Sequence, residues 1–153
     1  MMKPTDCVIR VDTDGEITAP LFPLEDTSNK LRQLVGPKCE IIELVFPERL
    51  YSVFKHHPVP DDGMIGLGML IDDNAVANGS RINMLASWLY GTDVHSCPIC
   101  GNVLFVGISR SEEGLDYCGY DGRDGVKLLN QLLKLRRALD EVTEGTNESI
   151  AYS

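Results

Sequence analysis

Positive charge is scarce in this chain of 153 residues. Fourteen Lys and Arg stand against 23 Asp and Glu, which gives a formal net charge of −9. A protein that tracks a DNA duplex needs a clustered cationic surface to displace counterions, so this composition argues against duplex nucleic acid as a partner. It argues equally against a basic protein of the membrane surface. The carboxylates are spread along the chain, so the charge by itself identifies no partner.

The sequence also lacks long hydrophobic runs. No window approaches the roughly 18 apolar residues of a membrane span, and the first residues, MMKPTDCVIRVD, have no apolar stretch typical of a signal peptide. The five cysteines are an odd number, whereas a disulfide-stapled secreted module usually has an even set. We therefore expect a cytoplasmic protein with no membrane partner.

Hydrophobic periodicity predicts an α+β fold: a small, mostly antiparallel sheet with two short helices and a longer C-terminal helix. Asp14-Gly15 lies between two alternating segments, which predicts a hairpin turn. The residues before the two short helices, Asp26 to Ser28 and Ser80, are expected to cap them. We expect one domain over residues 1–143 and a flexible tail over 144–153. The predicted strands are 7–12, 16–22, 39–46, 50–54, 64–72, 102–109 and 115–120, and the predicted helices are 28–35, 81–90 and 125–144.

The segment His95-Ser-Cys97-Pro-Ile-Cys100-Gly101 carries the most reactive side chains. Two cysteines at this spacing before a glycine form half of a zinc knuckle, and Cys118 could supply a further thiolate, so His95, Cys97, Cys100 and Cys118 are candidate zinc ligands. The same Cys pair could act as a redox dithiol, but strand rather than helix is expected after it, so the thiolate would lack stabilisation by a helix dipole. A third interpretation is that the cysteines are small buried residues in a turn.

Basic and aromatic residues gather in one segment in spite of the net charge: Arg49, Tyr51, Lys55, His56 and His57. If the fold brings Arg81, Asn83 and Trp88 to them, the result would be a cationic pocket able to bind a small nucleotide. Arginine would contact phosphate, an aromatic ring would stack on the base, and the asparagine would read polar edges. The alternative is that Trp88 belongs to the core and the arginines are solvated.

Catalytic constellations are missing. No serine stands in a nucleophile-elbow context, and the pair His56-His57 lacks the i, i+4 helical spacing of a metal site. The paired acidic residues adjoin turn residues, where carboxylates are normally solvated. The sequence therefore favours a protein that is not an enzyme.

The leucines of the last helix, from Leu128 to Leu139, recur at spacings of four and three residues. Such a stripe could pack on the protein's own sheet or form a contact between copies in a homo-oligomer. Both interpretations stay open at this point.

Three segments in order resemble an uncharacterised small-domain family of phages, plasmids and other bacterial mobile elements. They are LRQLVGPKCEIIELV, the stretch from Asp72 to Ser87 with INMLAS, and ICGNVLFVG. The resemblance implies a compact α+β accessory protein made inside a bacterial host. Since the family has no settled activity, it implies no catalytic residues.

The function we expect is therefore that of a non-enzymatic accessory protein that counters a host defence or regulatory pathway, for example by sequestering a small nucleotide signal. The first alternative is an acidic inhibitor that covers a basic surface of a host protein. The second is a zinc- or thiol-dependent enzyme, or a zinc-stabilised module, centred on Cys97 and Cys100.

Overall fold

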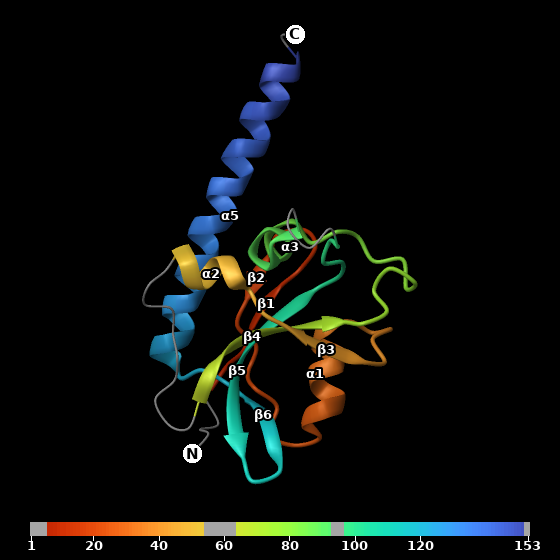
Figure 1. Cartoon of the computed structure of the whole chain (residues 1–153), viewed down its shortest axis with the longest axis vertical. Helices are drawn as coiled ribbons and strands as arrows, with labels where there is room; N and C mark the ends of the chain where they lie inside the picture. Colours follow the sequence, from red (N-terminus) through yellow and green to blue (C-terminus); the bar gives the residue numbers. More distant parts are fainter. Residues whose placement is uncertain (1–5, 54–63, 93–96, 152–153) are drawn as a thin grey trace.

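A computed structural model describes residues 6–53, 64–92 and 97–151 (Figure 1). Their centre is a sheet of six strands in the order β2-β1-β5-β4-β3, with β6 paired to β5, and every pairing is antiparallel. Four helices accompany the sheet in this part of the chain, the last of them the longest, so the predicted α+β fold is confirmed. The strands are β1 (Ile9–Val11), β2 (Ile17–Thr18), β3 (Ile42–Val45), β4 (Met64–Asp72), β5 (Val103–Ser111) and β6 (Gly114–Cys118), and the helices are α1 (Thr27–Val35), α2 (Glu48–Val53), α3 (Met84–Tyr90) and α5 (Gly122–Ala151).

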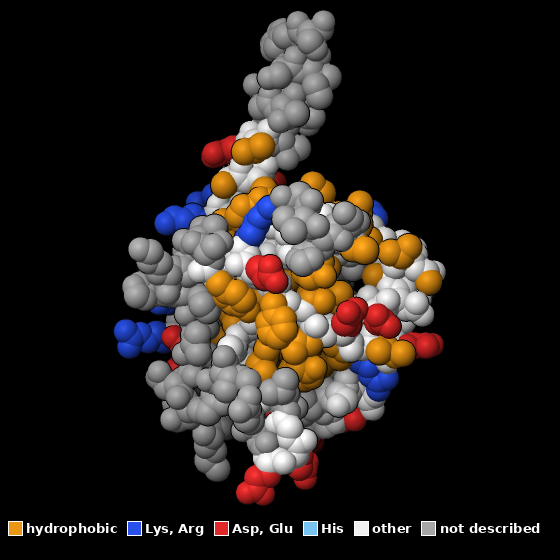
Figure 2. All heavy atoms as spheres, viewed as in Figure 1, with side chains coloured by type: hydrophobic (Ala, Val, Ile, Leu, Met, Phe, Trp, Pro, Cys, Tyr) orange, Lys and Arg blue, Asp and Glu red, His pale blue; other side chains and the backbone are white. Residues whose placement is uncertain are grey.

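Both faces of the sheet are covered, because successive side chains of a strand point to opposite faces. On one face, Phe105 and Met69 are fully buried in a cluster with the apolar sides of α2, α3 and α5. On the other face, Leu104 and Leu70 are fully buried beneath α1. In the view of Figure 2, hydrophobic side chains gather near the centre of the molecular surface, and acidic side chains lie beside them.

The predicted hairpin over Asp14-Gly15 is present. Arg10 pairs with Thr18 and Val11 with Ile17 on either side of the turn. Gly15 has φ 87°, a value that glycine adopts without steric cost. Asp12 orders the turn, since its Oδ1 accepts hydrogen bonds from the backbone amides of Asp14 and Glu16.

The strand predicted for residues 50–54 is wrong, because Glu48–Val53 forms helix α2. Pro47 precedes the helix, and the amide of Leu50 donates to its carbonyl at 2.9 Å. A proline followed by an acidic residue is a helix-start pattern. Leu50 is fully buried in the core. A side chain can be buried in this way on the inner side of a short helix as well as on the inner face of a strand.

The predicted cap at Ser80 is also wrong. Helix α3 begins at Met84, and Asn83 caps it, because the Asn83 side chain accepts a hydrogen bond from the amide of Ala86. At α1 the capping position is Asp26, whose side chain accepts no hydrogen bond from the backbone of the helix. It accepts instead from the side-chain amide of Asn29.

Helix α5 packs on the sheet through its first half. Leu128 and Leu132 are fully buried there, whereas Val142 is 66% exposed. The C-terminal part of the helix projects beyond the rest of the protein (Figure 1). The leucine stripe thus serves the protein's own core as far as Leu139, which packs at its margin. A contact between copies and the separate tail over 144–153 stay predictions.

Candidate functional site

The predicted basic and aromatic cluster forms in part, at the contact between α2 and α3. The Arg49 guanidinium donates to the carbonyl of Trp88 at 3.0 Å and lies 5.2 Å from the centroid of its ring. Trp88 is in the last turn of α3, where carbonyls lack helical partners and cations are favourable. Tyr51 is half-buried, and its hydroxyl donates to the carbonyl of Leu67, while burial raises its pKa to about 12. The Arg49 contacts join α2 to α3, and the Tyr51 hydrogen bond joins α2 to β4.

The structure places Arg81 and Asn83 away from that contact. Arg81 is exposed and pairs with Asp14 of the β1–β2 turn. The Asn83 side chain is 1% exposed, and its Nδ2 donates to the carbonyls of Val11 and Gly101, each at 3.0 Å. Asn83 therefore joins β1, the entry to β5 and α3. Lys55, His56 and His57, which were predicted to complete the cluster, lie outside the described residues.

The candidate zinc ligands are only partly described, since His95 lies outside the described residues. Cys97 is exposed and Cys100 is buried, and both are free thiols. Cys118 pairs with Gly107 along β5, whereas Cys100 precedes the beginning of that strand. The described residues contain no group of three His, Cys, Asp or Glu side chains that could hold a metal ion. Burial, followed by the charge of Asp116, raises the pKa of Cys118 to about 11.

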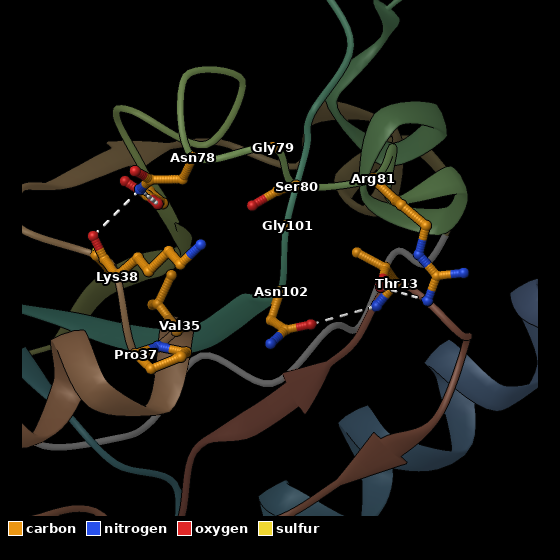
Figure 3. A pocket seen from close by; sticks show the side chains of 13 residues that line it. Thr13, Val35, Pro37, Lys38, Asn78, Gly79, Ser80, Arg81, Gly101 and Asn102 are labelled. Atoms are coloured by element: carbon orange, nitrogen blue, oxygen red, sulfur yellow. Dashed lines mark hydrogen bonds between the residues drawn. The ribbon is translucent and has the colours of Figure 1, made fainter.

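A polar pocket of about 310 Å³ lies where three loops meet, and the sequence did not point to it. The loops are the turn between α1 and β3, the segment that leads from β4 to α3, and the entry to β5 (Figure 3). The residues that line the pocket are Thr13, Val35, Gly36, Pro37, Lys38, Cys39, Asp72, Asn78, Gly79, Ser80, Arg81, Gly101 and Asn102.

Hydrogen-bond donors converge in this pocket. The Lys38 ammonium and the Ser80 hydroxyl point toward one another across it (Figure 3). Asn102 lies farther along the lining on the side of Thr13, and its Oδ1 accepts from the amide of Thr13 at 3.3 Å (Figure 3). That bond fixes the orientation of the Asn102 side chain, so its NH₂ group is turned to donate. A cation with neighbouring hydroxyl and amide donors is a combination suited to phosphate or carboxylate.

A buried carboxylate builds the wall behind Lys38. Asp72 is 8% exposed, and its two oxygens accept from the backbone amide of Asn74 and from the side-chain amide of Asn78 at 2.9 and 2.8 Å. The Asn78 side chain also donates to the carbonyl of Lys38 at 3.1 Å. This chain of bonds ties the loop after β4 to the turn before β3, so the backbone that carries the lysine is held in place.

Gly101 forms the floor of the pocket. Its φ is +83°, and a Cβ atom there would lie 3.5 Å from the Ser80 hydroxyl. The Gly101 amide donates to the carbonyl of Arg81, and its carbonyl accepts from Asn83. A side chain at this position would be strained and would fill space between the donors.

The pocket lining carries more positive than negative formal charge. Lys38 and Arg81 oppose the single carboxylate of Asp72, so the lining has a formal charge of +1 on a protein of charge −9. Cys39 is the one thiol of the lining. Burial, followed by the charge of Asp72, raises its pKa to about 11. Because the thiolate is the reactive form, this cysteine is a neutral, unreactive wall residue near pH 7.

Sequence reasoning missed Lys38, Asn78, Asn102 and Thr13, and it assigned Ser80 only as a cap. Gly36-Pro37-Lys38 and Asn78-Gly79-Ser80 are turn sequences, and polar residues in turns are ordinarily solvated. Their convergence depends on contacts between segments up to 89 positions apart, such as the bond from Thr13 to Asn102. Of the residues predicted to bind a ligand, Arg81 is the one that lines this pocket.

Comparisons with family models, curated proteins and solved structures found no match to this chain. None of the helices in the described ranges combines the length and apolarity needed to cross a bilayer.

Proposed function

We propose that this protein binds a small phosphorylated ligand, of the size of a mononucleotide, without converting it chemically. The observation that carries the proposal is that the Lys38 ammonium and the Ser80 hydroxyl point toward one another in a pocket that Asn102 also lines (Figure 3). Ligand sites usually enclose about 300 to 1,000 Å³. A pocket of about 310 Å³ is at the small end of this range, so it suits one mononucleotide rather than a dinucleotide.

The proposal includes that the pocket does not catalyse a reaction of its ligand. Catalysis by the pocket would need a nucleophile with an adjacent base, or an acid–base pair within hydrogen-bond reach of the ligand. The thiol of the lining is protonated at neutral pH, and both oxygens of its carboxylate hold backbone and amide donors in place. Cys39 and Asp72 therefore support the pocket and are not available for proton transfer.

In a bacterial host, such a protein would act by lowering the free concentration of a nucleotide signal. This role agrees with the resemblance to an accessory-protein family of phages and other mobile elements. We accordingly propose that it counters a defence or regulatory pathway of the host by sequestration.

The test is a thermal-shift titration with adenosine 5′-monophosphate and inorganic phosphate. A ligand at about 100 times its Kd adds about 2.7 kcal/mol to the free energy of unfolding, which raises Tm by several degrees. Lys38→Ala removes the cation and should abolish the shift, while Lys30→Ala, an exposed residue of α1 outside the pocket, should leave it unchanged. ³¹P NMR of the same mixture should show no new phosphorus species after prolonged incubation. Equal shifts in both variants, or turnover, would contradict the proposal.

A second candidate function, inhibition of a basic host protein, is favoured by a separate groove between α1, β3 and β6. Its volume is about 530 Å³, and Leu24 and Ile41 are more than half exposed there. Glu40 and Asp116 outweigh the single positive charge of Arg32, so the lining has a formal charge of −1. The test is affinity purification from host cells with the wild-type chain and with Ile41→Lys. A partner held by this groove binds the wild type and is lost from the variant, whereas a partner retained by both is not bound there.

A further inference from the structure

A second cation lies in the same pocket, apart from Lys38. Arg81 lies beside Thr13, on the other side of Gly101 and Asn102 from the lysine (Figure 3). Its Nη2 is 2.5 Å from the Asp14 Oδ1 and 3.5 Å from the Thr13 hydroxyl. The two charged side chains are 71% and 70% exposed. The charge of Arg81 is thus covered by a surface carboxylate and not by a partner in the core.

The turn that carries Asp14 is held from two sides. Asp12 accepts from the amides of Asp14 and Glu16 within the turn. From α5, the Arg136 guanidinium donates to the carbonyl of Gly15 at 2.6 Å. The backbone of Asp14 is therefore held in place next to Thr13 of the lining, and its carboxylate occupies the position that a ligand's anionic group would take on Arg81.

An exposed ion pair of this kind is weak, because water and salt screen it. A phosphate group bound bidentately by a guanidinium makes stronger, charge-assisted hydrogen bonds. An incoming phosphate can therefore displace the carboxylate, which turns outward into solvent at little cost.

We propose that Arg81 is a second anion subsite of the pocket, that Asp14 occupies it in the absence of ligand, and that the ligand is a compact molecule with two separated anionic groups, of the class of nucleoside 3′,5′-bisphosphates. One phosphate binds at Lys38, Ser80 and Asn102, and the other replaces Asp14 on Arg81. This inference rests on the proposed function of the same pocket.

The lining supports this ligand class in a second way. It contains no aromatic side chain, so there is no ring on which a base could stack within the pocket. Recognition then depends on the charges at the two ends of the ligand and on the amide of Asn102 between them. The cation–aromatic contact of Arg49 with Trp88 belongs to the α2–α3 contact instead.

The experiment is isothermal titration calorimetry of the full chain with adenosine 5′-monophosphate and adenosine 3′,5′-bisphosphate. We expect the bisphosphate to bind the wild type about tenfold more tightly than the monophosphate, because one more charge-assisted contact forms. Arg81→Gln should remove this difference, so that this variant binds the two ligands with about equal affinity. Asp14→Asn frees the arginine, so it should tighten bisphosphate binding about threefold to fivefold. Arg137→Gln, on the exposed side of α5 and outside the pocket, is the matched control and should change neither ligand.

The outcomes separate the two proposals. A wild type that binds the monophosphate but shows no preference for the bisphosphate overturns the second subsite alone. The second subsite alone is also overturned if Arg81→Gln still prefers the bisphosphate, or if Asp14→Asn binds the bisphosphate more weakly than the wild type does. A wild type that binds neither ligand overturns the proposed function together with the inference. Far-UV circular dichroism and Tm of each variant show whether it folds, which is expected because all three exchanged side chains are exposed.

Discussion

Asn83 provides the sharpest test of how this fold supports its pocket. The side chain makes three hydrogen bonds in a nearly water-free position: two as donor, to the carbonyls of Val11 and Gly101, and one as acceptor, from the amide of Ala86. Asn83→Ala removes all three bonds and leaves three backbone groups without these partners. An orphaned buried group costs about 1–3 kcal/mol, and loss of a capping side chain costs about 1 kcal/mol.

Since such terms overlap, we expect Asn83→Ala to lower the free energy of unfolding by about 3–5 kcal/mol, a large share of the 5–15 kcal/mol of a typical domain. Asn83→Ser keeps an oxygen able to cap α3 and should lose about 1 kcal/mol less. The control is Asn29→Ala, whose amide bonds to Asp26 on the surface, and which should change stability by less than about 0.5 kcal/mol.

Urea unfolding followed by circular dichroism measures these changes as shifts in midpoint at constant m-value. A loss below about 1 kcal/mol in Asn83→Ala would refute the reasoning, because the bonds would then contribute no more than a surface contact. Such a variant that also failed to bind a nucleotide would instead support the earlier interpretation of Asn83 as a residue that reads the ligand.

Two further predictions follow from the titrating groups. Partial desolvation, followed by the hydrogen bond with Asp73, raises the pKa of Glu43 above its ordinary 4.5, although Glu43 is an exposed residue. The native state therefore holds this proton more tightly than the unfolded chain, and stability falls as pH rises from about 4.5 through the raised pKa. Glu43→Gln should therefore raise Tm at pH 7, with a gain that shrinks toward pH 4; a gain independent of pH in scanning calorimetry would argue against this cause. Cys39 and Cys118, each with a pKa of about 11, hold only about 0.1% thiolate at pH 8. Iodoacetamide should alkylate the exposed Cys97 before either of them, and peptide mass spectrometry that finds Cys39 modified first would contradict the protonated wall thiol.

Much of the fold could be predicted from the sequence because the relevant information is local. The continuous apolar run in 102–109 and the Asp14-Gly15 turn specify strand and hairpin with neighbouring residues alone. Glu48–Val53 was mistaken for a strand because one turn and a half of helix is too short for its period to show, and the burial of Leu50 fits either structure.

The pocket could not be predicted, because its donors become neighbours only through the sheet. Lys38 is brought near Ser80 by the pairing of β3 with β4 and by the bond from Asn78 to the Lys38 carbonyl. Asn102 joins them because β5 lies beside both β1 and β4. Arg49 and Trp88 were predicted to bind a ligand because of their residue types. In the fold, they attach α2 to the end of α3.

The central claim is that ligand binds at the Lys38, Ser80 and Asn102 pocket, and a ¹H–¹⁵N NMR titration with adenosine 5′-monophosphate tests it most directly. The account predicts saturable shifts of the backbone amides of Gly79, Ser80, Gly101 and Asn102, which lie in the pocket lining, with little change at Arg49 and Trp88. Shifts that instead centre on Arg49 and Trp88, or no shifts at all, would contradict it.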